Sequence, residues 1–186
     1  FDDALNFYMQ ALEMNKEIYA DSYKANKKIY EAIQVICEKK GDYEKALEYL
    51  NKYYDYENQE KIEENPDLFF KMGFYHEKLG KYEEAISNFK KANELYETSS
   101  NELNNNLGKI DCVHMIGVCY FKLNKLQRAH ENLIRAYEQR KNLLPQEDPS
   151  MIESTRMLAT YFEKTGDYLQ ANKLRLSIHQ IYLDIY

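Results

Sequence analysis

The sequence contains no tryptophan, only six glycines and three prolines, and no long apolar run. So few turn-forming residues exclude a fold built from many short strands. No apolar stretch approaches the roughly 18 residues that cross a bilayer, and the first residues, Phe1 to Asp3, lack the character of a signal peptide. We therefore expect a soluble intracellular segment without membrane insertion.

Basic clusters and a disulfide framework are also missing. The net charge is −6 and lysines are scattered among glutamates, so no basic stripe could neutralise a phosphate backbone. This excludes nucleic acid as an expected partner. The cysteines Cys37, Cys112 and Cys119 are odd in number and lie inside helical patterns, which indicates reduced thiols and a cytoplasmic location.

Motifs for catalysis or metal binding do not occur. The chain has no phosphate-binding loop, nucleophile elbow, zinc-protease motif or dinucleotide fingerprint. Cys112, His114 and Cys119 are close in sequence, but the two cysteines stand two helical turns apart, too far for one tetrahedral zinc ion. We expect no enzyme activity, no catalytic residues, no metal and no cofactor.

What the sequence does have is helical periodicity. Charged residues make up 30% and apolar residues 44%, which suits long amphipathic helices and predicts an all-α fold. All three prolines fall between the expected helices, where they break none. Helices are expected at 2–19, 22–40, 42–62, 67–79, 82–99, 104–123, 125–143, 150–164 and 167–185.

A repeated pattern organises the chain. A turn residue, a polar residue, a large apolar residue, two polar residues and an alanine recur in that order, as in Gly80 to Ala85. The period is about 42 residues. The turn position needs a residue that tolerates the left-handed conformation. The repeated alanines are Ala4, Ala46, Ala85, Ala129 and Ala171, and the turn residues are Gly41, Gly80, Asn124 and Gly166.

This pattern resembles the tetratricopeptide repeat. The best copy runs from Phe69 to Ala92, with Met72-Gly73, His76, Ala85 and Phe89 at the family's positions. The resemblance implies a right-handed α-α superhelix of about 4.5 helix pairs, or roughly nine antiparallel helices. It divides one array over 1–186 into a second helix of a truncated repeat at 1–19, then repeats at 22–62, 67–99, 104–143 and 150–186.

The repeats are longer than the family's usual 34 residues, and in this they are similar to kinesin light chain arrays. The stretch from Tyr137 to Pro149 resembles the loop between such repeats. Arg156 and Met157 stand where that subfamily has paired asparagines. We expect the chain to be a piece of a longer array, in which further repeats or another chain cover an apolar stripe formed by Ile178, Ile181, Tyr182 and Ile185.

First helices line the concave side of such arrays, so their outward residues are candidate peptide-binding positions. Two interpretations are open for the aromatic ones: anchors in a groove for a peptide or helix, or core buried by neighbouring repeats. The same two interpretations are open for the crowded tyrosines near Tyr49 and Tyr53, which could pack between helices or form a surface that contacts a partner. The candidates are Glu31, Val35, Phe70, Phe74, Glu77, His114, Val118, Phe121, Arg156 and Thr160.

The resemblance implies a non-catalytic scaffold or adaptor that binds proteins or peptides within a larger assembly, with a cytoskeletal, motor or ciliary setting by similarity to kinesin light chains. The family's clamp for a chaperone carboxylate is missing, since Glu31, Val35, Phe70, Phe74 and His114 occupy its places. The alternative is a regulatory peptide receptor that switches an effector when its ligand binds.

Overall fold

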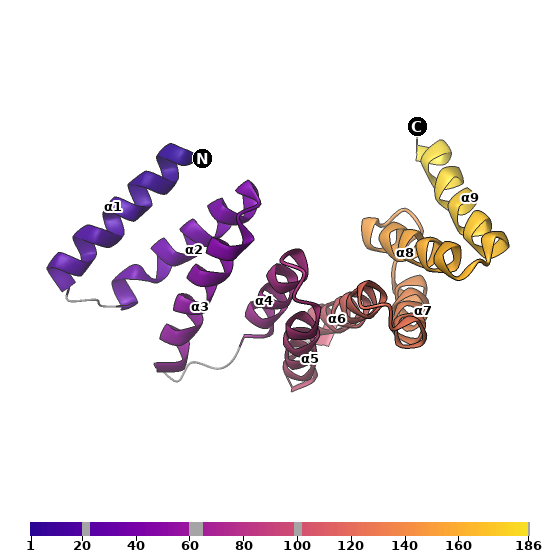
Figure 1. The fold of residues 1–186 in the computed structure, drawn as a ribbon, viewed down its shortest axis with the longest axis horizontal. Coiled ribbons are helices and arrows are strands. Elements are labelled where there is room, and N and C mark those ends of the chain that lie inside the picture. Colours follow the sequence, from indigo (N-terminus) through magenta and orange to yellow (C-terminus); the bar gives the residue numbers. More distant parts are fainter. Residues whose placement is uncertain (20–22, 60–64, 99–101, 186) are drawn as a thin grey trace. The chain divides into compact units, whose positions relative to one another are not determined.

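The computed structural model describes residues 1–19, 23–59, 65–98 and 102–185, and within them it contains nine α-helices and no strand (Figure 1). The all-α prediction is confirmed, and predicted helix ends differ from the observed ones by at most three residues. The helices are α1 (Asp2–Tyr19), α2 (Tyr23–Lys40), α3 (Tyr43–Gln59), α4 (Pro66–Lys78), α5 (Tyr82–Thr98), α6 (Glu102–Lys122), α7 (Leu126–Leu143), α8 (Pro149–Thr165) and α9 (Tyr168–Ile185).

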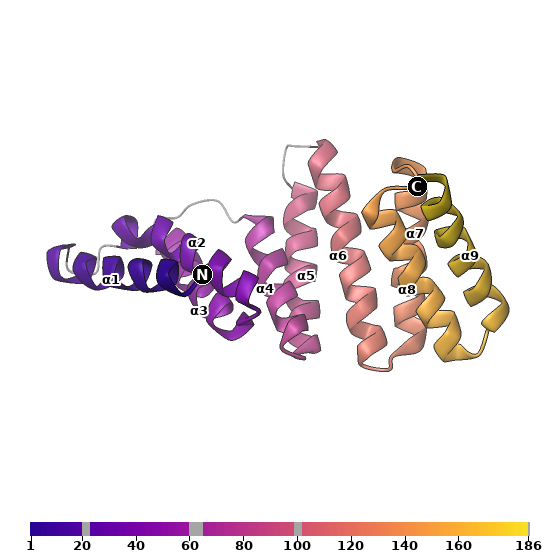
Figure 2. The ribbon, with the colours of Figure 1, turned by 90° about the horizontal axis from the view of Figure 1, so that it is seen from above.

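The chain divides into two compact units, Phe1–Asn88 and Phe89–Tyr186. In the first unit, α2 packs against α1 and α3, and α3 also contacts α4. In the second unit, consecutive helices from α6 to α9 pack in sequence, and Figure 2 shows them side by side. The prediction that all helix pairs form one array stays a prediction.

The turns inside the helix pairs share one geometry. Gly41, Gly80, Asn124 and Gly166 all have positive φ, between 58° and 85°, as the sequence predicts. At the second turn, the Gly80 amide donates to the Glu77 carbonyl and the Lys81 amide donates to the His76 carbonyl. The same two bonds recur at the other three turns, so two of the free carbonyls at each helix end are satisfied before the next helix begins.

Small residues let the helices of a pair approach closely. The repeated alanines Ala46, Ala85, Ala129 and Ala171 are all buried. Gly117 of α6 has the same role, since a Cβ there would lie 2.9 Å from Leu133 Cγ and 3.1 Å from the Leu133 amide nitrogen. The contact partner is therefore the leucine one turn after the alanine of α7, and any larger residue would push the two helices apart.

An apolar face of each of the helices α2, α4, α6 and α8 is buried. Ile33 and Cys37 of α2, Met72 of α4, Ile116 of α6 and Leu158 of α8 are each less than 9% exposed. All three cysteines are free thiols inside this core. These apolar side chains recur at the 3.6-residue period of a helix, and their burial supplies the main stabilisation of each of these helices.

The exposed stripe of α9 differs from the predicted one. Ile178 and Ile181 are half-buried because they turn toward the covered side of α9, which packs on α8. Leu176 is 66% exposed, and Tyr182 is also exposed. The side chain of Ile185 lies outside the described residues. Leu169, Leu176 and Leu183, spaced seven residues apart, therefore share the open face of α9, whereas Tyr182 is exposed on the side that carries Ile178 and Ile181.

A buried arginine joins three helices of the second unit. Arg140 of α7 is 4% exposed, and its Nη2 donates to Asp111 Oδ1 of α6 at 2.5 Å. Its Nη1 donates to Ser154 Oγ at 2.5 Å and to the Ser150 carbonyl at 2.9 Å, both in α8. A buried guanidinium needs such partners, because an unpaired charge would carry a large desolvation cost.

The left-handed turns give a direct test of the repeat. We expect Gly80→Ala to lower the free energy of unfolding by about 1–2 kcal/mol, because a Cβ is strained at φ 74° although space for it exists. The matched variant Lys81→Ala, one residue away and exposed, should change it by less than about 0.5 kcal/mol. Urea denaturation followed by circular dichroism measures both, and equal stabilities would contradict the assignment.

Candidate functional site

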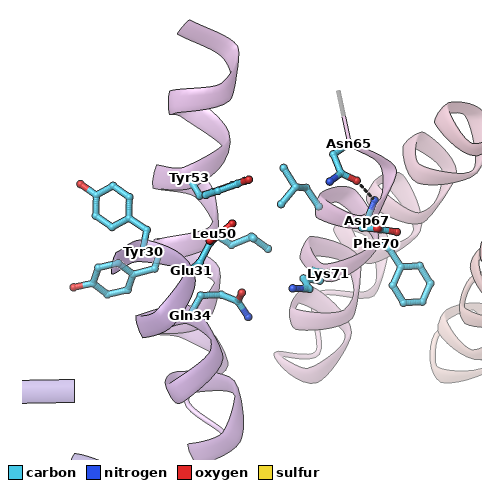
Figure 3. A pocket seen from close by; sticks show the side chains of 11 residues that line it. Tyr30, Glu31, Gln34, Leu50, Tyr53, Asn65, Asp67, Phe70 and Lys71 are labelled. Atoms are coloured by element: carbon cyan, nitrogen blue, oxygen red, sulfur yellow. Dashed lines mark hydrogen bonds between the residues drawn. The ribbon is translucent and has the colours of Figure 1, made fainter. Parts of the chain in front are cut away.

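A pocket of about 360 Å³ opens in the first unit where α2 and α3 face the beginning of α4 (Figure 3). Its volume lies at the lower end of the range of about 300–1,000 Å³ found for ligand sites. The helices on either side are held by their own packing, so the pocket is formed without a ligand. It is lined by Tyr30, Glu31, Gln34, Tyr49, Leu50, Tyr53, Asn65, Asp67, Leu68, Phe70 and Lys71.

Tyrosine rings form one side of this pocket. Tyr30 and Tyr49 have ring centroids 6.0 Å apart, and each ring is buried. Lysines contact the outer ring faces, with Lys52 Nζ 4.6 Å from the Tyr49 centroid and Lys27 Nζ 4.9 Å from that of Tyr53. Rings with low conformational freedom and a polar hydroxyl suit a binding surface that must contact both apolar and polar groups.

A hydrogen-bonded triad fixes the α2 side of the pocket relative to α4. Gln34 Nε2 donates to Glu38 Oε2 at 3.0 Å and also to the Tyr75 hydroxyl, which in turn donates to Glu38 Oε2 at 2.6 Å. Burial first, and then the bond to Glu38, raise the pKa of Tyr75 far above its usual value. Tyr75 therefore remains a hydrogen-bond donor, and Gln34 is held in place.

The start of α4 forms the opposite side. Asn65 caps the helix, with its Oδ1 accepting from the Asp67 amide at 2.9 Å, and Pro66 occupies the first helical position. Lys71 reaches back toward α2, while the ring of Phe70 turns away from the tyrosines (Figure 3). Glu31 and Lys71 are both exposed, so the pocket offers a carboxylate and an ammonium on facing helices.

Of the sequence-predicted residues in the first unit, Glu31 and Phe70 line this pocket, whereas Val35, Phe74 and Glu77 do not. Val35 is 41% exposed on α2. Phe74 is half-buried, with its ring edge-on to Tyr43 at 6.1 Å and Lys78 Nζ at 4.9 Å from its centroid. The Glu77 side chain is only 10% exposed, and Lys78 Nζ lies 3.0 Å from its Oε2 without hydrogen-bond geometry.

In the second unit, the predicted residues of α6 and α8 form a partly open aromatic and polar face. Phe121 and Val118 are half-buried, and Lys164 Nζ lies 4.5 Å from the Phe121 centroid. Arg156 is exposed and pairs with Glu153 at 2.5 Å. Thr160 donates to the Arg156 carbonyl at 3.0 Å. Since exposed ion pairs contribute little, Arg156 could exchange Glu153 for a ligand carboxylate at low cost.

The prediction that His114 contacts a ligand is wrong, because its side chain is only 4% exposed. Burial, and then the nearby Arg140 guanidinium, lower the pKa of His114 to about 3. Its Nδ1 has no hydrogen-bond partner among the described residues. His114 is therefore a neutral core residue and not part of the open face of α6.

Several residues that line the pocket could not be recognised as binding residues from the sequence. Tyr30 appears in the sequence as an ordinary core position, Gln34 and Lys71 as surface polar residues. The crowded tyrosines around Tyr49 and Tyr53 were the available signal, but packing and contact explain such a cluster equally well until the helices are placed. Within the described ranges, no three metal-ligating side chains come together, and no helix is long and apolar enough to span a membrane.

Two segments of the chain match sequence models of the tetratricopeptide repeat, residues 66–99 and residues 35–60. No curated protein has a matching sequence. Among solved structures, a Podosopora anserina protein described as a kinesin light chain with nearly identical TPR-like repeats has a TM-score of 0.72 at 14% identity. That match covers 99% of this chain and 88% of the other.

Two further structures were solved as peptide-binding proteins. The Rap conjugation gene regulator of the plasmid pLS20, in complex with the Phr* peptide, has a TM-score of 0.75 at 17% identity over 85% of this chain and 43% of its own. YrrB, described as a TPR protein with an unusual peptide-binding site, has a TM-score of 0.61 at 20% identity over 98% and 78%. These similarities confirm the predicted all-α solenoid fold.

The buried His114 makes stability depend on pH. Its pKa is about 3 in the folded chain and about 6.5 when unfolded, so acidification protonates the unfolded state first and favours it. We expect the free energy of unfolding to fall, relative to the variant His114→Gln, by about 2 kcal/mol between pH 7 and pH 5. Urea titrations of both proteins at each pH provide the comparison, and parallel pH profiles would contradict the assignment.

Proposed function

Because this chain is a tetratricopeptide repeat protein, we propose that it is a non-catalytic scaffold that docks short segments of partner proteins on its first helices. The family and fold support protein interaction as the general role. The observation that carries the finer proposal is the pocket of the first unit, which the predicted Glu31 and Phe70 line together with Tyr53, Leu50 and Lys71.

The chemistry of the pocket defines the kind of segment that fits. An apolar side chain would lie against Leu50, Leu68 and the tyrosine rings, where it is removed from water. Glu31 and Lys71 would hold polar groups of the same segment on either side. Since Gln34 is fixed by Tyr75 and Glu38, little ordering is needed on binding, which favours affinity.

Phe74 of α4 in the first unit and Phe121 of α6 in the second unit are further candidate anchors, each considered within its own unit. Both rings are half-buried and each has a lysine over it, so they could serve as anchors or as packing. The setting proposed is a cytoplasmic assembly of cytoskeletal, motor or ciliary type, supported by the three buried free thiols and by the fold shared with the kinesin light chain structure.

The second candidate, a regulatory peptide receptor, is favoured by the fold shared with the peptide-bound Rap regulator and by the mixed polarity of the pocket. It differs from a passive scaffold in requiring a conformational response. Small-angle X-ray scattering with and without a bound peptide separates the two, since a scaffold keeps its profile and a receptor changes it.

The pocket can be tested with a display library of random 12-residue peptides. We expect binders selected by the native chain to lose about tenfold or more in affinity on the double variant Glu31→Gln/Lys71→Gln, because both polar contacts are removed. The matched control Glu44→Gln/Lys39→Gln neutralises the same charges at exposed positions of α3 and α2 outside the pocket. Equal losses in both proteins would refute the proposed site.

A separate experiment decides whether Phe74 and Phe121 are ligand anchors or core residues. For Phe74→Ala and Phe121→Ala we expect the free energy of unfolding to fall by about 1–2 kcal/mol, roughly half the cost of truncating a buried phenylalanine such as Phe89. Affinity for the selected peptides should fall in the same variants. Losses of stability near 3–5 kcal/mol with affinity unchanged would assign both rings to the core.

A further inference from the structure

A second groove, of about 330 Å³, lies in the second unit along the N-terminal half of α6, between the C-terminal parts of α5 and α7. Its walls come from the second helices α5 and α7 and from α6 itself, and none of its lining residues belongs to the pocket of the first unit. Ile110 and Val113 form its floor and are both nearly buried. The walls carry Asn93, Glu97, Asn106, Lys109, Arg135, Gln139, Asn142 and Leu143.

Side-chain amides dominate the walls. Asn106, Gln139 and Asn142 each offer two N–H donors and a carbonyl acceptor, and among the described residues none of them is hydrogen-bonded to another side chain or to the backbone. Asn93 has only a long contact of 3.5 Å to Glu97. An amide pairs naturally with a peptide unit, which presents one donor and one acceptor, so these walls suit an extended backbone.

The charge of the groove opposes that of the chain. The chain carries −6 overall, yet among the described residues that line the groove Lys109 and Arg135 stand against one carboxylate, that of Glu97. Within the described residues, neither Lys109 nor Arg135 forms an ion pair. Two cations without ion-pair partners, against one carboxylate, give the described lining a positive balance, and a concave surface with such a balance attracts an acidic ligand.

From these three features we propose that this groove binds an extended segment of a partner protein that carries an acidic side chain next to an apolar one. The acidic group pairs with Arg135 and Lys109, the apolar side chain lies on Ile110 and Val113 beside the exposed Leu143, and the wall amides bind the peptide backbone. The groove thereby gives the scaffold a second docking site with a charge preference of its own.

The test uses a synthetic library of eight-residue peptides, acetylated and amidated, with a fixed Leu-Glu pair and random flanks. A matched library replaces the fixed Glu by Gln, and a third replaces it by Lys. We expect the Glu library to bind the native chain at least about tenfold more tightly than the other two, with binding weakened by added salt. Chemical-shift changes in ¹⁵N spectra should map to Asn93, Lys109 and Gln139.

Variants give the decisive comparison. Lys109→Gln/Arg135→Gln should lose about tenfold or more in affinity, and Gln139→Glu, which keeps size and adds a repelling charge, should do the same. The control Lys90→Gln/Lys122→Gln neutralises two exposed lysines of the second unit outside the groove. Equal binding of all three libraries, or unchanged affinity in both groove variants, would overturn the proposal. The Glu31→Gln/Lys71→Gln variant of the first unit should bind these peptides normally, which separates this site from the other.

Discussion

The close approach of two helices within each pair is the constraint on which the other features depend. It requires a residue with a very small side chain where the two backbones approach each other. Ala46, Ala85, Ala129 and Ala171 fulfil this requirement, and Gly117 does so on the facing helix α6. It also requires that the chain reverse direction within two residues, which the positive φ at Gly41, Gly80, Asn124 and Gly166 permits. Once these two conditions hold, the longer side chains of each helix are pushed outward into clefts between pairs.

The two grooves follow from that displacement. The pocket of the first unit lies where α4 meets α2 and α3, and the groove of the second unit lies where α6 passes between α5 and α7. Apart from Asn65, the described residues that line them lie on helices, which hold these side chains in place. They differ in character, because tyrosines and leucines surround the first, whereas side-chain amides and two cations surround the second. One scaffold could therefore hold two segments of different chemistry.

Features of the fold that are local and repeated can be predicted from the sequence. The turns, the alanines and the buried face of each first helix depend on residues within one or two helical turns, so their spacing predicts them. Features that depend on rotation about a helix axis were reached only in part. Glu31 and Phe70 do line a pocket, but His114 is buried, and the open side of α9 runs through Leu176 rather than Ile178. An error of one residue turns a helical side chain by 100°, enough to exchange inside for outside.

The hydrogen bonds of Arg140 could not be predicted from the sequence either. Arg140 stands beside Lys141, and the two together look like an ordinary solvated pair of basic residues. Its partners lie 29 residues earlier in α6 and up to 14 residues later in α8. In a solenoid, stability is a sum of terms for single repeats and terms for the interfaces between neighbours. If α8 were to melt away, Arg140 would lose two of its three partners and keep only Asp111 of α6. The two hydrogen bonds that Arg140 makes to α8 add to the interface term, so α8 and α9 should exchange their amide hydrogens together with α6 and α7.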